Sequence, residues 1–216
     1  MKAFATSAAI AAMAVVVGTA AARNIDHVGA PVIPVCTDTA VGIGWAEMSQ
    51  AKGMASRMFA PAGVTIVWKA MDNRCPADAL KVSLVNQSAP ADHPNSYAYA
   101  LPYDGTHIIL FWDRIKQYPE ERGLPYLLAH VLVHEITHIL QGFPHHSETG
   151  VMKARFATAD VGRMERHPLA FTTEDLQLIQ RGLQIRRARL AEKGILEPTR
   201  AGTMNAGTDA AVARAR

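Results

Sequence analysis

The sequence is short of cysteine, aromatic residues and charge. Only two of its 216 residues are Cys, aromatic residues make up 6% and charged residues 19%. Two cysteines exclude a small disulfide-stapled scaffold, so a packed core must stabilise the fold. The hydrophobic fraction of 49% is typical of a globular protein and excludes collagen-like, low-complexity and fully disordered chains. At about 100–200 residues per domain, the length predicts one domain with tails.

The basic character of the chain belongs to its ends. The formal net charge is +3, but residues 186–216 carry seven cations against three carboxylates, and residues 23–185 have a net charge of −2. The cations near the C-terminus are sparse, and no aromatic residues are interleaved with them. We therefore expect residues 198–216 to form a disordered, solvated tail, and we expect no nucleic-acid partner.

Residues 1–22 have the pattern of a secretory signal peptide. Lys2 gives a positive start, residues 10–18 form an unbroken small apolar run, and Ala20 and Ala22 occupy positions −3 and −1 of a cleavage site. The alternative is a membrane anchor, which needs about 20 strongly apolar residues. We expect cleavage and an exported product, periplasmic or secreted, with no membrane span in the mature chain.

Export makes a disulfide between Cys36 and Cys75 the expected state, because the compartment is oxidising and the number of cysteines is even. The alternative is two separate buried thiols. Neither Cys lies in a CxxC pattern, which argues against a redox motif and against zinc bound by cysteine.

Hydrophobic periodicity predicts an α/β (α+β) domain over residues 23–197. Asp38 or Thr39 is the expected cap of the first helix, with Trp45 and Met48 among its apolar positions. The order of elements predicts a mixed sheet with antiparallel edges and at least one helix against it, and a loop over 143–171. Strands are expected over 32–36, 64–68, 80–85, 96–101 and 107–112, and helices over 41–59, over 124–142 and from 172 or 173 onward.

Five of the nine His residues fall between positions 130 and 146. His134 and His138 are four apart in the predicted helix, so both imidazoles lie on one helix face, one turn apart, where they can bind the same metal ion. Glu135 points beside that face and can accept a proton from water without being a ligand. The alternative is that these are ordinary surface or core histidines.

Two His ligands are too few for a catalytic zinc ion, which has three protein ligands and one position for water. Gly142 allows the chain to reverse sharply after the helix, so the next donors, His145 and His146, are the candidates for the third ligand. The carboxylate alternatives are Glu148, Asp160 and Glu165.

The other histidines and a group of tyrosines have simpler interpretations. His130 continues the four-residue spacing upstream, but helical drift of about 40° per four residues carries it away from the metal, so we place it in the core. Tyr97, Tyr99 and Tyr103 alternate around a predicted edge strand, which can pair with an extended peptide or simply pack its aromatic rings. No sequence pattern assigns a role at the site to the remaining histidines, which are His27, His93, His107 and His167.

The helix, the glycine turn, the following His and the later Met resemble the zinc site of the metzincin metallopeptidases, whose pattern is HExxHxxGxxH followed by a Met-turn. Here the glycine lies one residue later and the third His one or two residues later. The sequence is more similar to predicted zinc proteases among bacterial exported proteins, which share a longer HExxHxxxG loop, a His-Ser pair and a Gly-hydrophobic-Met ending. On that alignment His146, followed by Ser147, matches the third ligand, and residues 149–152 match the Met-turn. The resemblance covers about residues 30–185.

This resemblance implies a metzincin-like zincin catalytic domain with an active-site helix and a C-terminal helix. One Zn²⁺ ion would be held by His134, His138 and His146, with Glu135 as the general base and Met152 as a hydrophobic floor. The implied function is that of an exported zinc-dependent endopeptidase, a hydrolase that acts on a peptide or protein substrate, and we expect a monomer. The alternative is a non-catalytic zinc-binding or protein-interaction module that retains the fold.

Overall fold

The computed structural model describes residues 30–38, 42–87, 96–101, 105–118 and 121–195. The predicted signal peptide and the predicted tail lie outside these residues, as do His27, His93 and Tyr103. No helix in the described part of the chain has the length and apolar character needed to cross a membrane.

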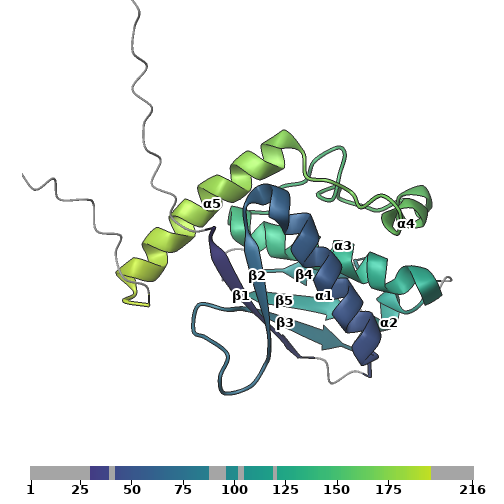
Figure 1. The fold of residues 1–216 in the computed structure, drawn as a ribbon, viewed down its shortest axis with the longest axis horizontal. Helices are drawn as coiled ribbons and strands as arrows, with labels where there is room; N and C mark the ends of the chain where they lie inside the picture. Colours follow the sequence, from purple (N-terminus) through teal and green to yellow (C-terminus); the bar gives the residue numbers. More distant parts are fainter. Residues whose placement is uncertain (1–29, 39–41, 88–95, 102–104, 119–120, 196–216) are drawn as a thin grey trace, which may run out of the picture.

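The sheet has five strands in the order β2-β1-β3-β5-β4 (Figure 1). β2, β1, β3 and β5 are parallel to one another, and β4 pairs antiparallel with β5. The sheet is mixed, as predicted, but only one of its edges is antiparallel, because the helix between β1 and β2 returns the chain in the same direction. The strands are β1 (Val32–Asp38), β2 (Thr65–Ala70), β3 (Leu80–Val85), β4 (Ala98–Ala100) and β5 (His107–Phe111).

Helix α1 (Trp45–Phe59) is the crossover between β1 and β2. It begins four residues later than predicted, and its N-cap is Gly44, so the expected caps Asp38 and Thr39 were wrong. Trp45 is 85% exposed and takes no part in the apolar face, which includes the buried Met48. The first residue of the helix therefore lies outside the core although it is apolar, whereas Met48, at the end of the first turn, belongs to the core.

Helix α3 (Leu124–Gln141) lies at the centre of the domain, and 16 of its 18 residues are buried. It ends as predicted at Gly142, whose φ is 82° and whose N–H donates to the carbonyl of His138 at 2.9 Å. α1 packs on it, and so does α5 (Thr173–Glu192). The contact with α5 is close at Gly182, because a Cβ there would lie 1.8 Å from the Leu140 carbonyl oxygen.

Two short helices were not predicted. α2 (Trp112–Ile115) directly follows β5, and α4 (Thr158–Met164) lies in the segment expected to be a loop. With four and seven residues, both are shorter than the window of about 11–18 residues over which helical periodicity is recognised, which explains why it missed them. Two 3₁₀ turns, Ala60–Ala62 and Glu121–Gly123, precede β2 and α3.

Cys36 and Cys75 form a disulfide, as predicted, with their Cα atoms 6.1 Å apart. It joins β1 to the connection between β2 and β3. The bond is consistent with an oxidising extracellular compartment.

Candidate metal centre

The imidazoles of His134, His138 and His146 converge. The first two project from α3 one turn apart, and their Nε2 atoms face each other at 3.0 Å. His146 follows on the loop after α3, and its ring centroid lies 5.3 Å from that of His134 and 5.0 Å from that of His138. One donor atom from each residue lies within 4.8 Å of the other two. The three residues predicted from the sequence are therefore together.

The donor set fits a zinc ion. Tetrahedral zinc with Zn–N bonds of 2.0–2.1 Å places two ligand nitrogens about 3.3 Å apart, close to the separation found between His134 and His138. Nδ1 of His134 donates a hydrogen bond to the Val151 carbonyl at 2.9 Å, which leaves its Nε2 unprotonated and directed into the cluster. Burial lowers the pKa of His134 to about 4 and that of His138 to about 3. Both rings are thus neutral at physiological pH, as metal ligation requires.

The turn at Gly150–Met152 contacts the ring of His134 through the Val151 carbonyl. Gly150 has φ of 77°, and a Cβ there would lie 2.3 Å from the Ala170 carbonyl oxygen, so only glycine fits. The same carbonyl accepts a hydrogen bond from the Val151 N–H at 3.0 Å, while the Val151 carbonyl faces His134. Met152 is fully buried. The turn therefore links the His cluster to the segment that precedes α5.

The loop that carries His146 is tied to the start of α5. Ser147 donates from its hydroxyl to Asp175 Oδ1 at 2.6 Å and from its backbone N–H to the Met152 carbonyl at 2.9 Å. Asp175 is fully buried, and its Oδ2 accepts the Thr172 N–H at 2.8 Å, while the Thr172 hydroxyl accepts the Asp175 N–H at 3.1 Å. The Thr-x-x-Asp spacing signals this capping box in the sequence. No sequence signal links it to Ser147, and this contact was missed.

Glu135 is 7% exposed and lies beside β4. Burial raises the pKa of its carboxyl to about 8, and a hydrogen bond from the backbone N–H of Ala100 opposes this rise. The side chain borders the same cleft as the three imidazoles. A carboxyl group therefore lies next to the His cluster without belonging to it.

The cluster opens into a cleft of about 560 Å³, a volume in the range of ligand sites. One wall is β4 with the preceding Ser96 and Tyr97, and β4 is an edge strand among those described. Tyr99 stacks on Phe111 with their centroids 6.2 Å apart. The cationic residues on the lining are Arg114, Lys153 and Arg155.

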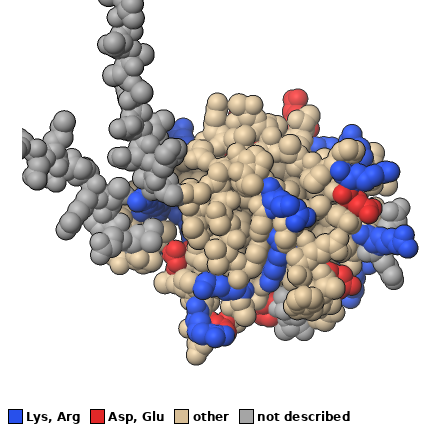
Figure 2. All heavy atoms as spheres, in the orientation of Figure 1, with Lys and Arg blue, Asp and Glu red and all other residues tan. Residues whose placement is uncertain are grey.

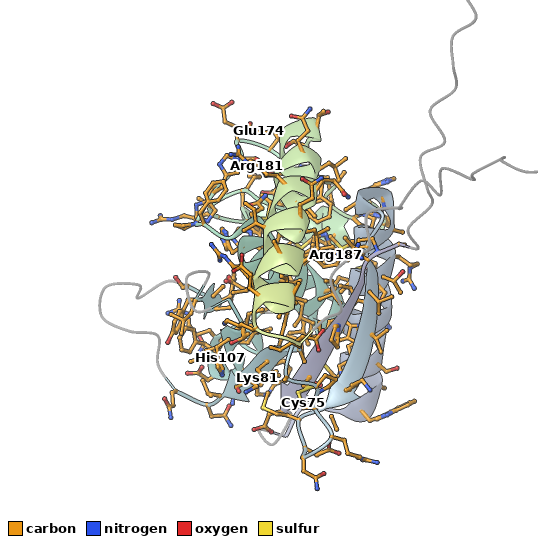
Figure 3. All side chains as sticks on the ribbon, turned by 90° about the vertical axis from the view of Figure 1, so that its left-hand side faces the viewer. Cys75, Lys81, His107, Glu174, Arg181 and Arg187 are labelled. Atoms are coloured by element: carbon orange, nitrogen blue, oxygen red, sulfur yellow. A yellow bond between two sulfur atoms is a disulfide. The ribbon has the colours of Figure 1, made fainter. Side chains whose placement is uncertain are left out.

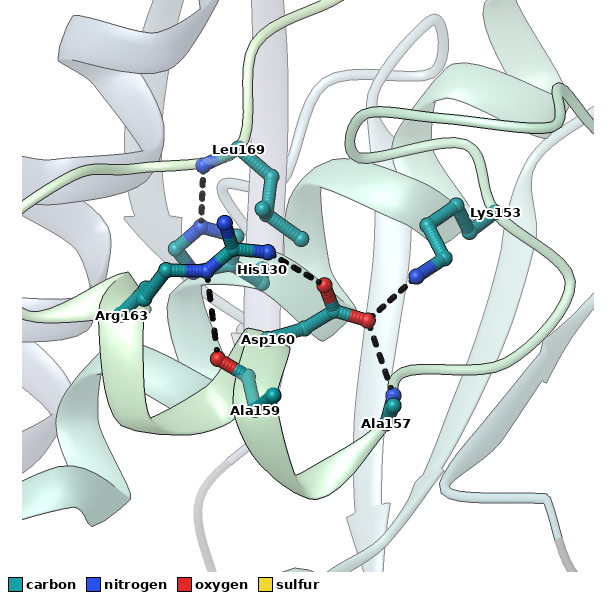
Figure 4. Close-up of polar contacts among 7 residues, drawn as sticks. All are labelled: His130, Lys153, Ala157, Ala159, Asp160, Arg163 and Leu169. Atoms are coloured by element: carbon teal, nitrogen blue, oxygen red, sulfur yellow. Dashed lines mark hydrogen bonds and ion pairs between the residues drawn. The ribbon is translucent and has the colours of Figure 1, made fainter.

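The rival candidates for the third ligand lie elsewhere. The ring of His145 lies against Phe143, 5.9 Å between centroids, outside the cluster. Glu148 and Glu165 are exposed and also lie outside it. Asp160 is buried in a different polar group, where Lys153, Arg163 and the Ala157 N–H surround its carboxylate (Figure 4).

His130 is a core residue, as predicted. Its Nδ1 donates to the Tyr126 carbonyl at 2.7 Å. Its Nε2 accepts the N–H of Leu169 at 3.0 Å, the contact drawn in Figure 4. Both ring nitrogens are therefore satisfied in the neutral form, and burial lowers the pKa to about 4. His107 and His167 are exposed and stand outside the cluster.

No protein-family model matches the chain, and no curated protein matches it in sequence. Among solved structures, the chain is similar to archaemetzincin from Methanopyrus kandleri, with a TM-score of 0.50 and 13% sequence identity. The match covers 74% of this chain and 99% of the archaemetzincin chain. At this identity the likeness concerns the fold alone. The chain thus has a mixed α/β fold similar to that of archaemetzincin, which confirms the fold class predicted from the sequence.

Proposed function

We propose that the protein is a zinc-dependent endopeptidase. The observation that carries this proposal is the convergence of three imidazoles with a buried carboxyl group in one cleft beside an edge strand. The archaemetzincin-like fold and the metzincin-like motif support the same assignment. Peptide or protein chains are the proposed substrates.

His134, His138 and His146 would hold one zinc ion. Zinc in such a site supplies a Lewis acid that polarises the scissile carbonyl, makes water a stronger nucleophile near neutral pH and favours the ionised form of a neighbouring carboxyl group. Glu135 would accept the proton of the attacking water and pass it to the leaving amine. Its place next to His134 and on the lining of the cleft supports this role.

β4 offers a binding edge for the substrate. An extended peptide that pairs with the edge of β4 left open by the described strands would lie along the cleft, held by main-chain hydrogen bonds. Tyr97 and Tyr99 border this path. Such binding depends little on side chains, so specificity would come from the residues that line the rest of the cleft.

The test compares the wild type with Glu135→Gln, loaded with equal amounts of zinc, on an unstructured protein substrate. The variant should bind zinc as the wild type does and cleave at least about 100-fold more slowly, because it lacks a group that can accept the proton. Glu148→Gln is the matched control, because Glu148 is an exposed carboxylate outside the His cluster. Equal cleavage by wild type and Glu135→Gln would contradict the role of Glu135 as general base. No cleavage by either would instead support the non-catalytic zinc-binding or interaction module.

We also propose that the protein is exported after removal of residues 1–22. The charge and hydropathy pattern of this segment supports export, and the Cys36–Cys75 disulfide is consistent with it. N-terminal sequencing of the protein from its native host tests the proposal. A mature chain that begins at Arg23 is the expected result, and an intact N-terminus on a cytoplasmic protein would contradict it.

A further inference from the structure

A second concavity of about 460 Å³ lies away from the cleft beside the His cluster, and the two share no lining residue. Its walls are the C-terminal half of α5, the last turn of α3 and the segments that lead into β3 and β5. Figure 3 views the outer face of α5, with Lys81 of β3 and His107 of β5 below its C-terminal end. This groove, hereafter the α5 groove, has no role in the proposed peptide hydrolysis.

The α5 groove is lined by cations. Arg181, Arg189 and Lys193 are exposed and recur at helical spacing along one side of α5. Among the described residues, none of the three forms an ion pair with a carboxylate. Asp78 is the single carboxylate on the lining. The charge of the groove is therefore strongly positive, whereas acidic and basic side chains are interspersed on the face drawn in Figure 2.

A half-buried arginine fixes the shape of the groove. Arg186 donates from Nη1 to the Gly105 carbonyl at 2.8 Å and from Nη2 to the Asp78 carbonyl. These bonds tie α5 to the segments before β5 and β3. The walls are thus held in place by contacts within the domain, and the groove needs no ligand to form.

The same groove exposes apolar side chains. Ile185 is 44% exposed, and Phe143 and Ile195 are 39% exposed each. Ile185 lies between Arg181 and Arg189 on the helix, one turn from each. Apolar and cationic side chains therefore lie next to one another along the groove.

We propose that the α5 groove binds an acidic, amphipathic peptide segment of a partner protein. Carboxylates on such a segment would face the three unpaired cations, and its apolar side chains would cover Ile185, Phe143 and Ile195. A concave site suits an inserted peptide better than a lipid bilayer. The chain's own residues 196–216, which follow Ile195, carry three cations against two carboxylates and do not complement the charge.

The experiment measures the fluorescence anisotropy of a labelled synthetic peptide in which pairs of Glu and Leu alternate. The full mature chain is used with Glu135→Gln, so that the peptide is not cleaved. The test variant carries Arg181→Glu, Arg189→Glu and Lys193→Glu. The control carries the same charge change at exposed cations outside the groove: Lys69→Glu, Arg166→Glu and Arg187→Glu.

The groove variant should bind the peptide at least about 30-fold more weakly than the parent, and the control at most about threefold more weakly. Ile185→Ser keeps every charge and should weaken binding about fivefold, because it removes an apolar contact. This single surface change also gives a result if the triple variant does not fold.

Four outcomes would overturn the proposal. Equal weakening by the two triple variants would mean that only net charge matters. If Ile185→Ser bound the Glu–Leu peptide as tightly as the parent does, and the parent bound an all-Glu peptide equally well, the groove would be a site for anions and not for an amphipathic segment. If the parent bound phosphatidylglycerol vesicles but not the peptide, and the groove variant did not bind the vesicles, the partner of the groove would be a membrane surface. A more than tenfold gain in peptide affinity on deletion of residues 198–216 would mean that the chain itself occupies the groove. None of these depends on whether the protein cleaves peptide bonds.

Discussion

Ser147 donates a hydrogen bond of 2.6 Å to the buried carboxylate of Asp175, 28 residues further along the chain. Asp175 also caps α5 through its other oxygen, so one side chain both begins the last helix and holds the loop next to His146. The two roles use different partners and are therefore separable by mutation.

Ser147→Ala should lower zinc affinity about tenfold, because it removes the bond that positions the loop. It should also lower the free energy of unfolding of the metal-free protein by about 1–3 kcal/mol, because the buried Asp175 carboxylate loses a hydrogen-bond donor. Competition with a chromophoric chelator measures the affinity, and thermal unfolding in EDTA measures the stability. Thr172→Ala is the matched change in the cap and should lower the free energy of unfolding by about 1 kcal/mol while zinc affinity stays within about twofold. Wild-type affinity in Ser147→Ala would show that Asp175 does not position the loop.

The third ligand is tested by two neighbouring substitutions. His146→Ala should lose zinc on dialysis against a weak chelator, whereas His145→Ala should retain it, because only His146 joins the imidazole cluster. Metal analysis after dialysis gives the stoichiometry. Equal retention by the two variants would refute the choice of His146.

Substitution by alanine should lower stability by different amounts at two glycines with positive φ. At Gly142 (φ 82°) no atom lies within 4 Å of an added Cβ, so only backbone strain of about 1 kcal/mol is expected. At Gly150 (φ 77°) the added Cβ also meets the Ala170 carbonyl, which should raise the loss to more than about 2 kcal/mol and weaken zinc binding by displacing Val151. Urea unfolding of both variants checks the order, and a smaller loss for Gly150→Ala would contradict this role of the turn.

The buried His130 should make stability depend on pH. Its pKa in the folded protein is lowered to about 4 from an ordinary 6.5, so between these values the unfolded chain binds more protons and stability falls as the pH falls. The loss reaches about 3 kcal/mol below pH 4. His130→Gln should reduce the slope of the free energy of unfolding against pH over this range, measured with urea on the metal-free protein. The slope should not vanish, because His134 and His138 also have lowered pKa values. The exposed His167→Gln is the control, and equal slopes in wild type and His130→Gln would contradict the assignment.

Local patterns predicted much of the fold. The alternation of Leu80, Val82 and Leu84 identified the buried face of β3, and helical periodicity with Gly142 defined α3 almost to the residue. The direction of strand pairing was only partly predicted, because it depends on how the crossover through α1 packs. The exposed Trp45 also could not be predicted from local sequence, because an apolar residue at helical spacing enters the core only if tertiary packing covers it.

The sequence indicated which histidines belong to the candidate site, but not the contacts that hold the loop with His146 in place. The spacing of His134 and His138 on one helix is a local property, so the sequence sufficed. Which of two adjacent histidines turns toward them is decided by contacts of Ser147 with Met152 and Asp175, one of them 28 residues away. Contacts at such separations leave no periodic signal in a single sequence.

In the proposed function, one zinc ion held by three histidines makes this protein a peptidase. The most direct measurement is the rate of cleavage of an unstructured protein by chelator-treated enzyme as zinc is added back. We expect no cleavage without metal and a rate that rises linearly until one zinc ion is bound per chain. A rate that survives removal of the metal, or no cleavage with one zinc ion bound per chain, would contradict it.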